Sequence, residues 1–158
     1  MSKIDTVERT FMSQALELAK KAARLNETPV GAVLVLEGKI IGTGFNRMEA
    51  DHDPTAHAEM AALRQATGKA GTWRLPSATL YVTLEPCIMC ASALIHARIK
   101  RVVYGARDHR WGGFGSLFDF AHDPRINHEI EVVSGIMEEE AAKLLRSFFK
   151  NVRNRSGY

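Results

Sequence analysis

The 158-residue sequence contains only two cysteines and has no long apolar run. Two cysteines do not supply the disulfide framework of a small secreted domain, which indicates a reducing compartment. No apolar stretch approaches the roughly 20 residues needed to cross a bilayer, and the N-terminus lacks the apolar core of a signal peptide. Internal repeats are also absent. These absences predict a cytoplasmic protein without a membrane partner.

Hydrophobic residues make up 46% of the chain and charged residues 25%, proportions that are typical of a globular protein. A chain of this length buries roughly 70% of its unfolded surface. We therefore predict a single domain at 1–158, with its core at about 5–150 and a frayed tail at 151–158. The net charge is only +3, but five cations and one anion fall between Arg98 and Arg110. Such a local excess can hold a phosphate backbone.

Apolar periodicity predicts a first helix at 5–25, with Asp5 and Glu8 as a capping box, and a last helix at 137–150. Five other runs have the length and composition of strands: 30–36, 39–45, 79–83, 101–104 and 129–133. Glu37-Gly38 joins the first two as a tight hairpin turn. The segment between the last two strands is too long for a hairpin. We expect it to hold a crossover helix, with those strands parallel.

Two more helices are expected in the middle of the chain. Thr55 is the expected N-cap of a helix that runs to about Ala66, and a second helix follows Pro86 and ends near Arg98. The alternation of helices and strands indicates an α/β protein. We predict three layers, α/β/α, around a central five-stranded mixed sheet.

Two short runs supply the residues of a zinc site: His57-Ala58-Glu59 and Pro86-Cys87-Ile88-Met89-Cys90. Thiolate and imidazole ligands favour zinc over magnesium or calcium. With His57, the two cysteines make three ligands, whereas a structural zinc takes four protein ligands and a catalytic zinc keeps one position for water. Because His57 and Glu59 are two residues apart, both can serve the metal only at the first turn of a helix. Glu59 is then placed to carry protons for zinc-activated water, which is the chemistry of hydrolytic deamination.

A thiol redox pair is the alternative interpretation of Cys87 and Cys90, because Cys-x-x-Cys also occurs at strand-to-helix junctions in redox proteins. The run His57-Ala58-Glu59 argues against it, since a redox pair has no use for these residues. Only the combination of the two motifs is specific.

At His57, Glu59, Pro86, Cys87 and Cys90 the sequence resembles the zinc-dependent nucleobase deaminases. It is most similar to the bacterial tRNA-specific adenosine deaminases, with agreement in the segments 29–33, 46–47, 53–59, 78–87, 105–108 and 115–117. The resemblance implies the cytidine-deaminase-like fold, one zinc ion per subunit and a homodimer. It also implies hydrolytic deamination of adenosine to inosine at the wobble position of tRNA, by zinc-activated hydroxide with Glu59 as the proton shuttle.

The resemblance further implies how the tRNA anticodon loop is held. Asn46 is a candidate donor and acceptor for the purine, and Asp108 belongs to the segment that holds the target nucleoside and its ribose hydroxyl. The latter contact would favour RNA over DNA. Arg107 opens a stretch of cations and aromatic residues that can grip phosphates and stack on bases. Phe149 is expected to border the substrate.

Two other functions remain open from the sequence. A zinc deaminase of a free base or nucleotide, of the guanine or cytidine type, would share the metal motifs but would not need the basic aromatic stretch. A non-catalytic, zinc-stabilised RNA-binding module is the other alternative, and Glu59 argues against it.

Overall fold

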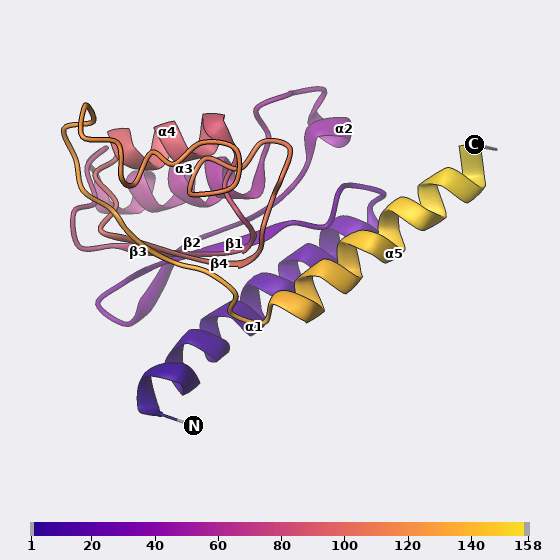
Figure 1. Ribbon diagram of the computed structural model, residues 1–158, viewed down its shortest axis with the longest axis horizontal. Helices are drawn as coiled ribbons and strands as arrows, with labels where there is room; N and C mark the ends of the chain where they lie inside the picture. Colours follow the sequence, from indigo (N-terminus) through magenta and orange to yellow (C-terminus); the bar gives the residue numbers. More distant parts are fainter. Residues whose placement is uncertain (1, 157–158) are drawn as a thin grey trace.

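The computed structural model describes residues 2–156 and has a sheet between two layers of helices (Figure 1). The five strands are β1 (Gly31–Leu36), β2 (Lys39–Phe45), β3 (Thr79–Leu84), β4 (Arg101–Ala106) and β5 (Glu131–Val133). Their order is β2-β1-β3-β4-β5, with β1 antiparallel to both neighbours and with β3/β4 and β4/β5 parallel. The predicted five-stranded mixed sheet is therefore confirmed.

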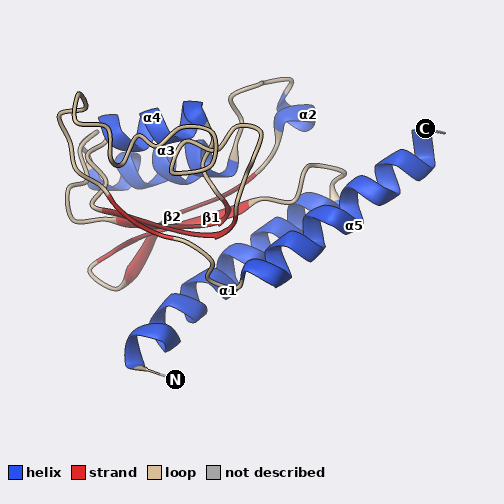
Figure 2. Cartoon of the chain, viewed as in Figure 1, coloured by secondary structure: helices blue, strands red, loops and turns tan. Residues whose placement is uncertain are grey.

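Helices cover both faces of the sheet. They are α1 (Lys3–Arg24), the single-turn α2 (Met48–Asp51), α3 (Ala58–Ala70), α4 (Ile88–His96) and α5 (Glu138–Ser156). Figure 2 shows α1 and α5 side by side on one face, running in the same direction, and α3 and α4 on the other. Within the described residues, no helix is long and apolar enough to cross a membrane.

Separate apolar clusters hold the layers together. On one face of the sheet, Leu34 and Leu80 pack with Leu94 of α4, and all three are fully buried. On the other face, Met12 of α1 packs against Val33. Successive strand residues point to opposite faces, so a strand covered on both sides is apolar throughout, as β1 is.

The hairpin between β1 and β2 turns at the two predicted residues. Glu37 has φ 52° and Gly38 has φ 75°, the left-handed conformations that a two-residue turn between twisted strands requires. Further along β2, Gly42 and Gly44 lie against α3, where an added Cβ would overlap backbone oxygens of that helix. The absence of side chains at these two positions lets α3 lie close to the sheet.

The capping box of α1 differs from the prediction. It is formed by Ser2 and Asp5, each of whose side chains accepts the other's backbone N–H. Glu8 is instead 5% exposed, and its carboxylate lies 2.7 Å from the guanidinium of Arg101. Its position on the buried side of α1 explains why it is not available as a cap.

The start of α3 also differs. The helix begins at Ala58, so His57 is the N-cap residue. The hydroxyl and backbone N–H of Thr55 donate to the Asp53 carboxylate instead. The predicted N-cap is therefore two residues early, because Thr55 stabilises a turn before the helix.

Two expectations for the second half of the chain were wrong. The segment 107–130, between β4 and β5, contains turns and isolated bridges but no crossover helix, although the two strands are parallel as predicted. At the end of the chain, α5 continues through Ser156, so 151–156 is helical and not a frayed tail. Residues 157–158 of the predicted tail lie outside the described residues.

Candidate metal centre and active site

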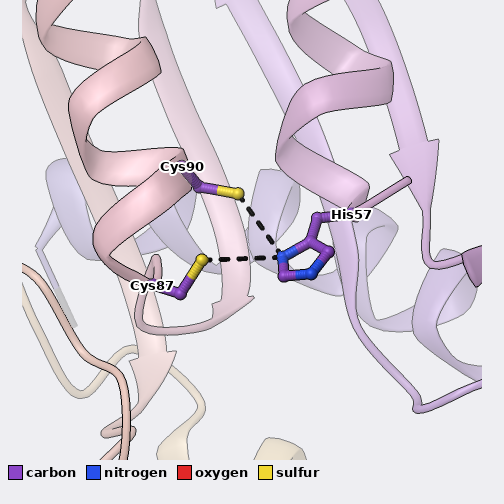
Figure 3. A group of neighbouring side chains, drawn as sticks. All are labelled: His57, Cys87 and Cys90. Carbon is purple, nitrogen blue, oxygen red and sulfur yellow. Dashed lines mark hydrogen bonds between the residues drawn. The ribbon is translucent and has the colours of Figure 1, made fainter. Parts of the chain in front are cut away.

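The predicted metal ligands come together at the N-termini of two helices. His57 is the N-cap residue of α3, Cys87 is the N-cap residue of α4, and Cys90 lies in the first turn of α4. Figure 3 shows the two sulfur atoms converging on the imidazole ring, with His57 Nδ1 3.6 Å from each Sγ. The partial positive charge of helix N-termini favours thiolates at this position.

These distances fit a tetrahedral zinc ion. With Zn–N of about 2.0–2.1 Å and Zn–S of about 2.3 Å, a tetrahedral angle separates the nitrogen and sulfur atoms by about 3.6 Å. Within residues 2–156, His57, Cys87 and Cys90 are the only group of three or more potential ligands of these residue types with such close ligand atoms. The cluster thus supplies three protein ligands and leaves a fourth position for water, as in catalytic zinc sites.

Glu59 lies in the first turn of α3, beside the ligand cluster. It is 4% exposed, and this burial raises the pKa of its carboxyl to about 7. The charge of Cys87 also raises this pKa, whereas that of His57 lowers it. A carboxyl group with a pKa near neutrality is suited to both accepting and donating a proton.

The pKa values of the two cysteines are shifted in opposite directions. A hydrogen bond from Cys90 and a weaker one from His57 outweigh burial and lower the pKa of Cys87 to about 4. The same Cys90–Cys87 bond, together with burial, raises the pKa of Cys90. A metal held by both cysteines takes them as thiolates, so its binding is accompanied by proton release.

A pocket of about 520 Å³ opens beside the ligand cluster. Its size lies in the range of small-molecule sites. It is lined by Pro54, His57, Cys87, Ile88, Met89, Asp108 and Trp111. Of these, Trp111 is 61% exposed, so the pocket has an open aromatic rim.

Two of the predicted substrate-binding residues lie at this site. Asp108 lines the pocket, and its Oδ1 accepts the backbone N–H groups of Arg110 and Trp111 at 3.0 and 3.2 Å. Asn46 is 4% exposed, and its Oδ1 accepts the N–H of Ala58 at 2.8 Å. Asn46 therefore satisfies an otherwise unpaired donor at the start of α3, next to His57.

The other two predicted residues do not line the pocket. The Arg107 guanidinium lies 3.5 Å from the Tyr104 hydroxyl. Phe149 is 44% exposed and belongs to a separate pocket of about 670 Å³ that it forms with residues around Leu25 and Met48. A contact of either residue with substrate remains a prediction.

Sequence reasoning missed Glu85, which precedes Pro86 in the cysteine motif. Its side chain is 1% exposed and accepts four hydrogen bonds from Asp108, Phe114 and Ser116. The one available signal was an acidic residue directly after an apolar strand. Its partners, 23 to 31 residues further along the chain, could not be read from local patterns.

Comparison with known proteins places this site in a class of enzymes. Residues 5–106 match the model of the cytidine and deoxycytidylate deaminase zinc-binding region. The chain belongs to this zinc-dependent deaminase family.

The chain is similar to several individual deaminases over most of its length. The chain is 50% identical over 147 residues to the tRNA-specific adenosine deaminase of Haemophilus influenzae, covering 92% of this chain and 85% of the relative. It is 45% identical over 150 residues to the Bacillus subtilis enzyme of the same name, covering 95% and 93%. A structure from a study of A-to-I editing by tRNA:A34 deaminases is 47% identical with a TM-score of 0.83, covering 86% of this chain and 99% of that one. A guanine deaminase from Nitrosomonas europaea is 25% identical with a TM-score of 0.78, covering 89% and 83%.

Proposed function

We propose that this protein hydrolytically deaminates adenosine to inosine at the wobble position of tRNA. The observation that carries the proposal is the three-ligand metal centre with the buried carboxyl of Glu59 beside it. The identity of 41–50% to tRNA-specific adenosine deaminases, over most of both chains, specifies the substrate.

The residues of the site divide the reaction between them. His57, Cys87 and Cys90 hold zinc, which, when bound, supplies an activated water as the nucleophile. Glu59 would accept one proton from the attacking water and deliver it to the purine ring. It would then move the second proton of that water to the departing amino group, so that water replaces ammonia at C6 and inosine is formed.

The surroundings of the metal centre suit a nucleotide that is turned out of a single-stranded loop. The exposed indole of Trp111 can stack on a base at the pocket rim. Asp108 lies in the same pocket, and its Oδ2 has no partner among the described residues, which leaves it available for a ribose hydroxyl. Asn46, Arg107 and Phe149 belong to the proposal as further contacts with the anticodon loop.

Deamination of a free purine is the second candidate function. The similarity to the Nitrosomonas europaea guanine deaminase favours it, and the pocket of about 520 Å³ is large enough for a free base. The identity of 25% to that protein is about half of that to the tRNA-specific enzymes, so tRNA is the better-supported substrate. A purely structural zinc module would not need Glu59 buried at an incomplete ligand set.

The deciding experiment is an assay of inosine formation in an anticodon stem-loop RNA with adenosine at the wobble position. Free adenosine, cytidine and guanine are assayed in parallel. We expect conversion of the stem-loop alone, lost after chelation. Glu59→Ala is expected to keep its zinc but to lower kcat by about 10²–10⁴-fold, because proton transfer is lost. Turnover of a free base without the stem-loop would move the protein to another deaminase branch.

A cytoplasmic homodimer is part of the same proposal. Leu117 and Phe118 follow the loop that carries Asp108 and Trp111 and are 47% and 50% exposed, which leaves apolar surface for a second subunit. A reducing compartment would keep Cys87 and Cys90 as metal-binding thiols. Sedimentation with and without the stem-loop RNA would give the mass of a monomer if the dimer proposal is wrong.

A further inference from the structure

The carboxylate of Glu85 connects the segment that carries the two cysteines to the loop at 108–116. It lies between β3 and Cys87 and is 1% exposed. Oε1 accepts the N–H of Asp108 at 3.2 Å and the Ser116 hydroxyl. Oε2 accepts the N–H groups of Phe114 and Ser116 at 3.1 and 3.2 Å. All four donors come from this one loop, which we name the pocket loop.

The pocket loop is also joined to the cysteine motif through the backbone. Ile88 N–H donates to the Trp111 carbonyl at 3.0 Å, and Gly113 N–H donates to the Pro86 carbonyl at 2.9 Å. These bonds flank an antiparallel bridge between Cys87 and Gly112. The pocket loop is therefore also joined to the segment that carries Cys87 by backbone bonds that do not involve the Glu85 side chain.

Gly112 allows this close approach. A Cβ at this position would overlap Glu85 Oε2 and would lie 2.5 Å from the backbone oxygen of Asp108. Cβ contacts below 3.0 Å are essentially never observed. The carboxylate therefore occupies the space that any side chain at 112 would need.

Glu85 has no cationic partner among the ion pairs of residues 2–156. Burial of a carboxylate is costly unless it is hydrogen-bonded. At Glu85 this compensation comes entirely from the pocket-loop donors and so depends on one loop conformation. Loop order and carboxylate burial are therefore coupled.

We propose that Glu85 is a positioning residue for the nucleotide, because it holds Asp108 and Trp111 of the pocket loop over the metal centre. The inference rests on the proposed function and deepens it. Asp108 and Trp111 line the pocket, and Asp108 is bonded to Glu85 through its own N–H. Glu85 itself does not line the pocket, so it acts on substrate through these two residues.

Glu85→Gln tests this arrangement because the amide has nearly the shape of the carboxylate but carries an NH₂ donor in place of one acceptor oxygen. An amide NH₂ cannot replace Oε2, since both partners there are backbone N–H donors. At the Oε1 position it can donate to the Ser116 hydroxyl, but it faces the Asp108 N–H. The substitution therefore selectively removes the bond to Asp108, because the amide NH₂ and the Asp108 N–H are both donors and face each other without an acceptor.

We expect Glu85→Gln to raise KM for the anticodon stem-loop about tenfold, with a smaller change in kcat and an unchanged zinc content. The second readout uses Trp111, which Trp73→Phe makes the only tryptophan of the chain. In this background, Glu85→Gln should lower the fluorescence anisotropy of Trp111, because the pocket loop gains mobility. Gly112→Ala acts on the same contact from the loop side and should have both effects if Glu85→Gln does not fold.

Glu8→Gln is the matched control, since Glu8 is also a buried carboxylate but lies on α1, which covers the opposite face of the sheet from α3 and α4. It should lower Tm without altering KM or Trp111 anisotropy. If Glu85→Gln behaves in the same way as this control, the positioning role is refuted. If the wild-type enzyme does not convert the stem-loop, the proposed function fails, while the Trp111 anisotropy still decides whether Glu85 orders the loop.

Discussion

Gly44→Ala is expected to weaken both the fold and the metal centre, because this glycine lies under the first turn of α3. An added Cβ would overlap the Ala58 carbonyl oxygen and would lie 2.8 Å from both Ala61 Cβ and Ala62 N. Backbone atoms cannot rotate away, so the start of α3 must retreat by about 1 Å.

The movement of α3 lowers the stability of the fold. Overpacking of a core position costs about 1–3 kcal/mol, which lowers Tm by about 2–4 °C for each kcal/mol in a domain of this size. The same movement carries His57 away from Cys87 and Cys90, whose sulfur atoms now lie 3.6 Å from its Nδ1. We expect zinc affinity to fall about tenfold or more, as for other changes that misplace a ligand.

Two further glycines make the test specific. Gly42→Ala would overlap the Ala62 oxygen, one turn further along α3, and should cost similar stability with a smaller loss of zinc affinity. Gly68, inside α3, has no atom within 4 Å of an added Cβ. Gly68→Ala should therefore stabilise the protein by about 0.5–1 kcal/mol.

Thermal unfolding followed by circular dichroism gives Tm, and competition with a chromogenic chelator gives zinc affinity. Equal zinc affinities for Gly44→Ala and Gly42→Ala would show that His57 is not displaced with the start of α3. A Tm for Gly44→Ala at or above the wild-type value would refute the close packing of α3 on β2.

Two other outcomes test the ligand set and the core. Cys87→Ala leaves two protein ligands, so the purified protein should lose most of its zinc and its deaminase activity; an undiminished zinc content by mass spectrometry would remove Cys87 from the ligand set. Burial, with the charge of Glu8 as the next cause, raises the pKa of Tyr81 from 10.0 to about 12. Between these pH values the unfolded chain loses a proton that the folded protein retains, so stability falls as pH rises. Tyr81→Phe should reduce this fall in Tm, and an unchanged slope would show that Tyr81 does not cause it.

The metal centre could be predicted from the sequence because its parts are local. His57 and Glu59 are two residues apart, and Cys87 and Cys90 are three apart, so one helix start each is enough to arrange them. Strands β1, β3 and β4 were equally visible, since burial on both faces leaves continuous apolar runs. The hairpin turn at Glu37-Gly38 followed from its two residues alone.

Only the tertiary structure decided what surrounds the metal. Glu85 binds donors at 108–116 through contacts that no local periodicity records. The same holds for Asn46, whose side chain caps a helix that begins twelve residues later. In the segment 107–130, which has no helix, residues 108–119 are held by isolated bridges and by the carboxylate of Glu85. Local spacing determined the ligands, whereas packing between distant segments determined the pocket in which a substrate is held.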